Sequence, residues 1–286
     1  MRWQGGRRGG NIEDRRGMGA GTVAGGGAGM IILALIAYFI FGVSPEEAGL
    51  PDPSTQTAST SEAARTGTPE DEAGQFVDII GANINDVWSQ AIRGYTEPRI
   101  VLYDRGTQTA CGVGQAAMGP FYCPPDQTVY LDLSFWQQMQ DQLGASGADF
   151  AKAYVIAHEF GHHIQTLTGV SDQVRKAQQL ARSQEEANAY QVAMELQADC
   201  YAGVWAAHAA EVSGGKVALE RGDIEEGLRT AQAIGDDMIQ KRTQGYVTPE
   251  AFTHGSAEQR VEWLCKACRP EIRRRVIRST SEPRSS

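Results

Sequence analysis

Residues 149–163 read Asp-Phe-Ala-Lys-Ala-Tyr-Val-Ile-Ala-His-Glu-Phe-Gly-His-His, and the rest of the fold is best approached from them. The first nine residues lack Gly and Pro and are rich in Ala, which favours a helix. On that helix His158 and His162 project from one face, one turn apart, at the spacing with which two imidazoles share a zinc ion. Glu159 lies beside them, where a carboxylate can take a proton from water. The alternative is an ordinary surface helix that happens to carry titratable residues.

A second helical stretch, residues 185–202, carries Glu195 and Asp199 one turn apart within an otherwise apolar run. A catalytic zinc has three protein ligands and an open fourth position. An unpaired carboxylate buried in an apolar run would be costly, so both acids need partners. We expect Glu195 to complete the metal ligands and Asp199 to hydrogen-bond the far nitrogen of a ligand histidine. The alternative is that both acids pair with Lys or Arg at the surface.

The two motifs, His158–His162 and Glu195–Asp199, resemble those of the gluzincin metallopeptidases. Longer strings resemble more specifically the bacterial neutral zinc metallopeptidase family, up to about residue 265. The resemblance implies a helix-dominated α+β, zincin-like domain with a zinc cofactor and a peptide or protein substrate whose sequence it does not define. It ends at Cys265–Cys268 and the Arg-rich tail. The further strings that carry it are residues 13–17, 119–123, 130–135 and 252–260.

The resemblance also implies a hydrogen-bond donor that stabilises the oxyanion opposite the general base. His254, in a Gly- and Thr-containing stretch between two helices, is the candidate, and Tyr246 is the reserve. The alternative is that His254 caps the helix that starts at Ser256. His163 follows His158 by five positions, so it points away from the ligands and is expected to lie behind the metal or at the surface. Gly161 is expected to allow close packing beside the ligands.

The remaining domain shows many helical patterns and few strands, which favours a helix-dominated α+β fold. Residues 99–103 and 128–133 are the predicted strands. By the resemblance, residues 128–133 are expected to be an edge strand that receives substrate as an added strand. Helices are predicted at residues 76–93, 135–143, 171–212 and 224–242, besides the metal helix.

The N-terminus is predicted to stand apart from this domain. Residues 24–43 are uncharged and end in an apolar run, and 20 helical residues reach roughly 30 Å, the thickness of a bilayer core. Arginines precede this segment and acids follow it, so the positive-inside rule puts residues 1–23 in the cytoplasm and the catalytic domain in the periplasm or outside the cell. A cleaved signal peptide and a buried core helix are the alternatives.

Composition sets the other boundaries. Residues 44–72 are rich in Pro, Ser, Thr and acids and are predicted to form a flexible acidic linker. The metallopeptidase domain is predicted at residues 73–268 and a basic, disordered tail at residues 269–286. The net charge of −9 argues against nucleic acid as a partner.

Five cysteines leave at least one outside any intrachain pairing. Cys111 and Cys123 bracket a Gly-rich loop, and outside the cytoplasm a disulfide there is expected. Cys200 is expected to be a buried thiol. Cys265 and Cys268 form a lone CxxC without two further ligands nearby, so they predict no second zinc site.

The sequence therefore predicts a membrane-anchored zinc metallopeptidase, with His158, His162 and Glu195 as metal ligands and Glu159 as general base. A catalytically inert binding or scaffolding protein of the same fold at the cell envelope is the alternative, but it would lack Glu159 or a ligand, and none is missing. A metal-storage protein would need more His and Cys than this chain has.

Overall fold

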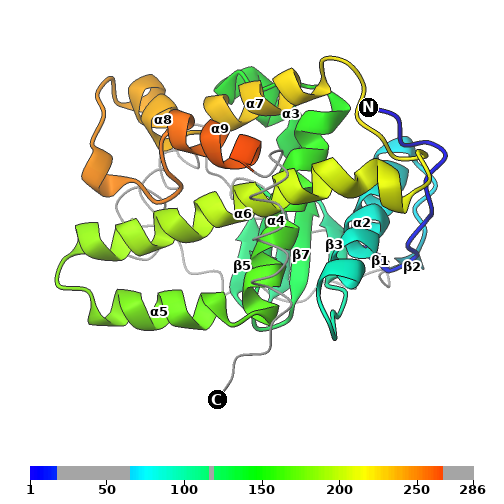
Figure 1. Ribbon diagram of the computed structural model, residues 1–286, viewed down its shortest axis with the longest axis horizontal. Coiled ribbons are helices and arrows are strands. Elements are labelled where there is room, and N and C mark those ends of the chain that lie inside the picture. The colour runs from blue at the N-terminus through cyan, green and yellow to red at the C-terminus, as the bar shows by residue number, and fades with distance from the viewer. Residues whose placement is uncertain (18–64, 116–118, 267–286) are drawn as a thin grey trace.

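The computed structural model describes residues 1–17, 65–115 and 119–266. It is a helix-dominated α+β fold in which helices pack against a small mixed sheet (Figure 1). The elements in chain order are β1 (Ile12–Asp14), β2 (Arg65–Gly67), α2 (Glu72–Ala91), β3 (Arg99–Tyr103), β4 (Gly106–Thr109), β5 (Gly112–Gln115), β6 (Phe121–Cys123), β7 (Thr128–Asp132), α3 (Phe135–Leu143), α4 (Asp149–Leu167), α5 (Val170–Leu180), α6 (Gln184–Val212), α7 (Asp223–Ala233), α8 (Asp236–Thr243), η3 (Pro249–Ala251) and α9 (Ala257–Lys266).

The sheet has the strand order β2-β1-β3-β7-β6. β1, β3 and β7 run parallel, and β2 and β6 are antiparallel to their neighbours. Side chains alternate along β3: Ile100 and Leu102 belong to the main core with α2 and α4, whereas Val101 and Tyr103 belong to a smaller core on the opposite face. The main core therefore lies between the sheet and the two helices, one of which carries the metal motif.

The expectation that residues 128–133 form an edge strand was wrong. β7 pairs with β3 on one side and with β6 on the other, and all five of its residues are buried. A strand buried along its whole length is typical of the interior of a sheet, not of its edge. The edge on this side is the short strand β6, which contacts α4.

The hairpin of β4 and β5 sits over the smaller core and is tied to the sheet by the predicted disulfide. Cys111 and Cys123 are bonded, with their Cα atoms 5.9 Å apart. Phe121 stacks on Tyr130 with ring centroids 5.0 Å apart, and Gly114 approaches the Phe121 ring. Part of the stretch that the sequence suggested to be a Gly-rich loop is thus strand β5.

Residues 1–17, here called the N-terminal arm, belong to the folded domain. β1 pairs with β3, and the side chains of Trp3 and Ile12 are buried in the main core. Arg8 donates to Asp78 on α2, a carboxylate that has no exposed surface. The prediction that this segment stands apart from the domain was wrong, because its contacts are to residues far away in the sequence and leave no local pattern.

The pairing of β1 with β3 also bears on the membrane prediction. Among the described residues, no helix is both long and apolar enough to cross a membrane. The predicted anchor, residues 24–43, and the tail, residues 269–286, lie outside the described residues, as does most of the linker. A single crossing between β1 and β2 would put β1 and β3 on opposite sides, and this conflicts with their pairing. The N-terminal arm and the rest of the domain must therefore lie on the same side of any membrane.

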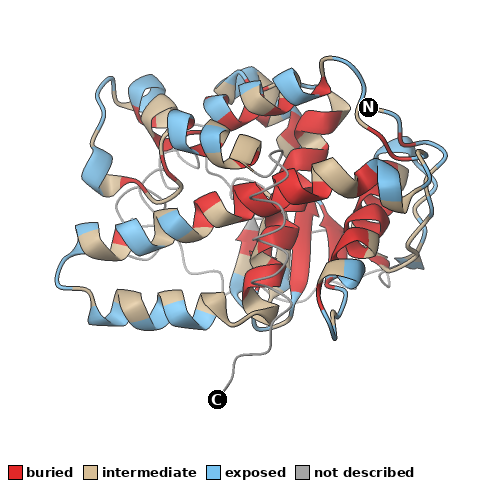
Figure 2. Cartoon of the chain, viewed as in Figure 1, coloured by how far each residue is buried: buried red, intermediate tan, exposed pale blue. Residues whose placement is uncertain are grey.

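Two of the predicted long helices are each two separate helices in the structure. The stretch at 171–212 breaks into α5 and α6, and Ser183 caps α6 by accepting from the Glu186 backbone N–H at 3.1 Å. The stretch at 224–242 breaks at Gly235 into α7 and α8. A Cβ at Gly235 would overlap the backbone of Ala257, so the break also lets α9 pack close. Burial is concentrated where α6 crosses α4, whereas α5 has no buried residue (Figure 2).

Candidate metal centre

The crossing of α4 and α6 brings the three predicted ligands together. Nε2 of His158 lies 3.0 Å and Nε2 of His162 lies 3.3 Å from Oε2 of Glu195. One donor atom from each residue lies within 4.8 Å of the others. Two ligand atoms on a tetrahedral zinc are about 3.4 Å apart, given zinc–ligand distances of about 2.1 Å. The donor set of two imidazoles and one carboxylate therefore fits zinc.

A glycine allows this crossing to be close. A Cβ at Gly161 would lie 2.9 Å from Cα of Ala198, a distance that real Cβ atoms essentially never show. Ala198 lies between Glu195 and Asp199 on α6, so the contact sets how closely both acids approach the histidines. Gly161 was expected to ease packing beside the ligands, and its neighbour is the backbone of α6.

Asp199 holds the ring of His158 from behind. Its Oδ1 lies 2.8 Å from Nδ1 of His158, and the carboxylate has no exposed surface. Burial raises the pKa of Asp199, but Arg260 and His158 outweigh it and lower that pKa to about 2. The ionised carboxylate only accepts, so Nδ1 donates and Nε2 is left to offer its lone pair to a metal.

Gln165 has the same function for His162. Its side-chain nitrogen donates to the Met194 carbonyl at 2.6 Å and to Gln197 Oε1 at 3.0 Å. The amide oxygen is therefore turned toward His162, whose Nδ1 lies 2.9 Å away and must donate. Gln191 in turn donates to Oε1 of Glu195 at 2.8 Å. Each ligand thus has a partner that fixes its orientation.

The electrostatics of the cluster favour a cation. Burial raises the pKa of Glu195, but His162 and His158 outweigh it, and the pKa lies well below its ordinary value. Burial lowers the pKa of both histidines, but Asp199 beside His158 and Glu195 beside His162 outweigh it and raise them. Carboxylates that stay ionised and histidines that attract positive charge are the properties of a cation site.

Glu159 is buried next to the ligands, with 7% of its surface exposed. Burial raises its pKa above the ordinary value, although His162 and His158 act in the opposite direction. A carboxylate with a raised pKa is better suited to accept a proton at neutral pH.

His254 lies in the turn before α9 and is held by Asp236. Oδ2 of Asp236 accepts from the backbone N–H groups of Thr253 at 2.7 Å, His254 at 2.6 Å and Gly255 at 3.1 Å. Oδ1 lies 3.4 Å from Nδ1 of His254. Burial lowers the pKa of His254, but Asp236 and then Glu195 outweigh it and raise that pKa.

The capping role proposed as the alternative for His254 belongs to Ser256. Ser256 Oγ accepts from the Gln259 backbone N–H at 3.2 Å, and Gln259 Oε1 accepts from the Ser256 backbone N–H at 2.9 Å. This reciprocal pair is a capping box. The reserve candidate, Tyr246, is 62% exposed on the loop after α8.

His163 is neither a ligand nor a surface residue. It has no exposed surface, its Nε2 donates to the Thr96 carbonyl at 2.6 Å, and its Nδ1 accepts from the Tyr122 hydroxyl at 3.0 Å. It therefore joins α4 to the sheet side of the core. Cys200 is buried, as predicted.

Several residues around the site were not found from the sequence. Tyr154 precedes His158 by four positions, Gln165 follows His162 by three, and Gln191 precedes Glu195 by four. These spacings place each on the same helical face as a metal ligand, and that signal could have found them. Asp236 and Arg260 come from other elements, and no spacing relates them to the ligands.

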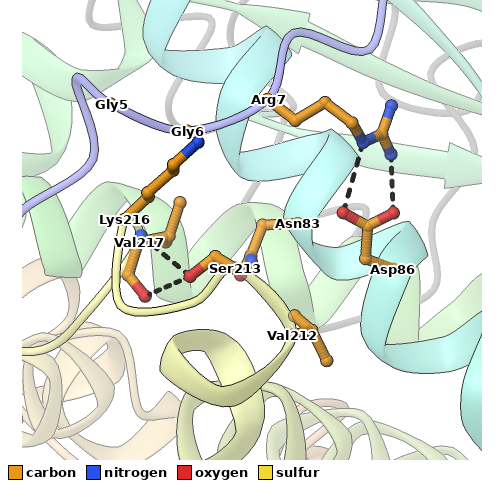
Figure 3. A pocket seen from close by; sticks show the side chains of 9 residues that line it. All are labelled: Gly5, Gly6, Arg7, Asn83, Asp86, Val212, Ser213, Lys216 and Val217. Atoms are coloured by element: carbon orange, nitrogen blue, oxygen red, sulfur yellow. Dashed lines mark hydrogen bonds and ion pairs between the residues drawn. The ribbon is translucent and has the colours of Figure 1, made fainter.

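A cavity of about 400 Å³ lies away from this cluster, between the N-terminal arm, α2 and the end of α6 (Figure 3). Two of its charged side chains are paired: Arg7 donates to both carboxylate oxygens of Asp86, at 2.7 and 3.3 Å. Ser213 bonds to the backbone of Val217. The contact between Arg7 and Asp86 joins the arm to α2.

This chain belongs to the family described as "Putative neutral zinc metallopeptidase", whose match covers residues 1–270. It is similar to "Uncharacterized protein YpfJ" of Escherichia coli (strain K12), with 46% identity over 276 residues, 92% of this chain and 93% of the relative. It is also similar to "Uncharacterized protein Rv2575" of Mycobacterium tuberculosis, with 44% identity over 210 residues, 70% of this chain and 69% of the relative. No solved structure matches the chain significantly.

Proposed function

We propose that this chain is a zinc-dependent peptidase whose metal is held by His158, His162 and Glu195. The observation that carries the proposal is the convergence of these three donor groups within 4.8 Å, with the carboxylate of Glu159 buried beside them. Membership of a family described as zinc metallopeptidases supports the same chemistry. The substrate is a peptide or protein.

The two histidines and Glu195 hold the metal, and Asp199, Gln165 and Gln191 keep them oriented. When bound, zinc polarises the peptide carbonyl and lowers the pKa of a water molecule. Glu159 takes the proton from that water and then delivers it to the leaving amine. Its raised pKa supports both transfers, because the group must hold the proton between them.

His254 is proposed to donate a hydrogen bond to the oxyanion as it forms. Asp236 accepts from the backbone around His254 and stands beside its Nδ1, so the ring is fixed within the turn. The positive charge favoured on His254 suits a donor to an oxyanion.

We also propose that the catalytic domain lies outside the cytoplasm and that residues 24–43 attach the chain to the membrane without carrying the N-terminal arm to the opposite side. The Cys111–Cys123 disulfide supports an oxidising compartment. Because β1 pairs with β3, the N-terminal arm must share this compartment with the domain.

The catalytic proposal is tested with Glu159→Gln in the full chain, and with Glu185→Gln, an exposed acid on α6, as the matched control. Zinc content is measured by mass spectrometry and turnover with a library of quenched fluorescent peptides. We expect Glu159→Gln to keep its zinc and lose turnover by several orders of magnitude, because the general base is absent. The control should behave as the unaltered chain does. Unchanged turnover in Glu159→Gln would refute the mechanism.

A further inference from the structure

We propose that Arg260 is a positioning residue of the metal centre: it fixes the carboxylate of Asp199, and Asp199 fixes the ring of His158. The proposal rests on the zinc site proposed above. Arg260 lies on α9, which contributes no ligand, and it is 4% exposed. It was not among the residues that the sequence indicated.

The contact between Arg260 and Asp199 uses both carboxylate oxygens. Nε of Arg260 donates to Oδ2 at 2.9 Å and Nη2 donates to Oδ1 at 3.0 Å. This two-point contact fixes the plane of the carboxylate, which a single hydrogen bond cannot do. Asp199 itself has no exposed surface, so water does not compete for it.

Oδ1 of Asp199 is shared among three donors. Besides Nη2 of Arg260, the Tyr154 hydroxyl donates to it at 2.6 Å and Nδ1 of His158 lies at 2.8 Å. Nη2 of Arg260 also donates to the Tyr154 hydroxyl at 3.2 Å. The position of the oxygen that the histidine uses is thus set from two other sides, and Arg260 contributes to both.

The guanidinium is committed to the protein and not to a substrate. Its Nη1 donates to the Ile234 carbonyl at 3.4 Å, so Nε, Nη1 and Nη2 all have partners within the fold. With so little surface exposed, Arg260 cannot meet a peptide directly. Its effect on the reaction must pass through Asp199.

The start of α9, the helix that carries Arg260, is held close to the turn that contains His254. Asp237 Oδ1 accepts from the Ala257 backbone N–H at 2.6 Å, and the absence of a side chain at Gly235 lets Ala257 approach. The neighbouring Asp236 holds His254. Residues 235–237 therefore position both the oxyanion donor and the start of the helix that supports the metal ligand.

Lysine separates orientation from charge. Arg260→Lys keeps the positive charge beside Asp199, but a single ammonium lacks the planar fork that contacts both oxygens and the Tyr154 hydroxyl together. If Arg260 acted through its charge alone, this variant would bind zinc as the unaltered chain does. If it acts by orienting Asp199, zinc binding must weaken.

The matched control is Arg8→Lys. Arg8 donates to Asp78, which is as fully buried as Asp199, but this pair joins the N-terminal arm to α2 and has no contact with the ligands. Both substitutions should lower the melting temperature of the metal-free chain. Only Arg260→Lys should change the metal site.

The experiment measures the zinc Kd of the full chain by competition with a chelator, and the visible spectrum of the chain loaded with Co²⁺. Arg260→Lys should weaken zinc binding by about 10- to 100-fold and change the Co²⁺ spectrum, as expected when a partner of a ligand histidine is disturbed. Arg8→Lys should leave the zinc Kd within about twofold of that of the unaltered chain and should not change the Co²⁺ spectrum. Tyr154→Phe, which removes one hydroxyl, should weaken zinc binding less than Arg260→Lys and serves if the latter does not fold.

Equal zinc affinities in Arg260→Lys and Arg8→Lys, or unchanged affinity in Tyr154→Phe when Arg260→Lys does not fold, would overturn the positioning role. Because the experiment measures zinc binding, neither of these results would contradict the proposed peptidase activity. If the unaltered chain binds zinc but hydrolyses no peptide, only the proposed function is contradicted. Absence of zinc binding in the unaltered chain would overturn both.

Discussion

The N-terminal arm and the metal centre are both buried, but they are encoded differently. The centre depends on His158 and His162 on α4 and on Glu195 on α6, and each helix carries its part of the pattern within five consecutive residues. The arm depends on β1 pairing with β3 and on Arg8 meeting Asp78, 70 positions away. The arm's Gly and Arg content is typical of a solvated flank, yet Trp3 and Ile12 are core residues.

The difference teaches where local patterns are informative. Ligands one helical turn apart must share a face, so their spacing predicts geometry directly. A three-residue strand has no period of its own, and its place is decided by a partner strand that the local sequence does not identify. Pairing between segments that are distant in the sequence can nevertheless decide whether the domain folds at all.

The largest effect is expected from deleting residues 1–17. The deletion removes a sheet strand and two buried side chains that contribute about 1.5–3 kcal/mol each. It also leaves Asp78 buried without its partner, at a cost of about 3–5 kcal/mol. These losses approach the total stability of an ordinary domain, about 5–15 kcal/mol, so the chain should not fold. Circular dichroism and the zinc content of the purified chain measure the outcome.

The matched control replaces residues 18–64 with a short Gly/Ser linker. β1 and β2 are neighbouring antiparallel strands, with Asp14 opposite Arg65, so a short connection can join them. This variant should fold and bind zinc. A folded, zinc-binding chain without residues 1–17 would show instead that the arm is an accessory, as its composition suggests.

His254 lies between the two cases, because the resemblance indicated it and Asp236 positions it from another element. His254→Ala should lower turnover by about 10²–10³-fold, the usual effect of losing an oxyanion donor. Zinc content should stay the same, since His254 is not a ligand. Turnover with peptide substrates and zinc content are measured on the same preparations.

Ser256→Ala is the control for this substitution. Ser256 caps α9, so its loss should lower the free energy of unfolding by about 1 kcal/mol and leave turnover nearly intact. If His254→Ala lost stability and kept its turnover, His254 would be a structural residue of the turn.

Much of the fold could be predicted from periodicity. The strands at 99–103 and 128–132 and the helices around residues 80, 140 and 160 stand where the apolar patterns place them. The position of β7 inside the sheet could not be predicted, because the neighbour on its outer side, β6, is only three residues long. The breaks before α6 and α8 were missed because Ser183 and Gly235 lie within stretches of good helix formers.

The candidate site divides in the same way. The ligands and Glu159 follow from spacing on two helices, and the structure brings the ligands together. Arg260 and Asp236 could not be found, because a buried Arg or Asp has no distinguishing local pattern until its partner is known. Asp199 could be predicted from the sequence because it follows Glu195 by one helical turn.

The central claim is that His158, His162 and Glu195 hold one zinc ion per chain. The most direct test is the zinc content, by mass spectrometry, of the purified full chain and of His158→Ala and Glu195→Ala. His208→Ala is the control, because His208 lies on the same helix as Glu195 and contacts Glu211 at its end, 3.1 Å away. We expect about one zinc per chain in the unaltered protein and the control, and a large loss in the two ligand variants. Folded ligand variants that keep stoichiometric zinc would contradict the account.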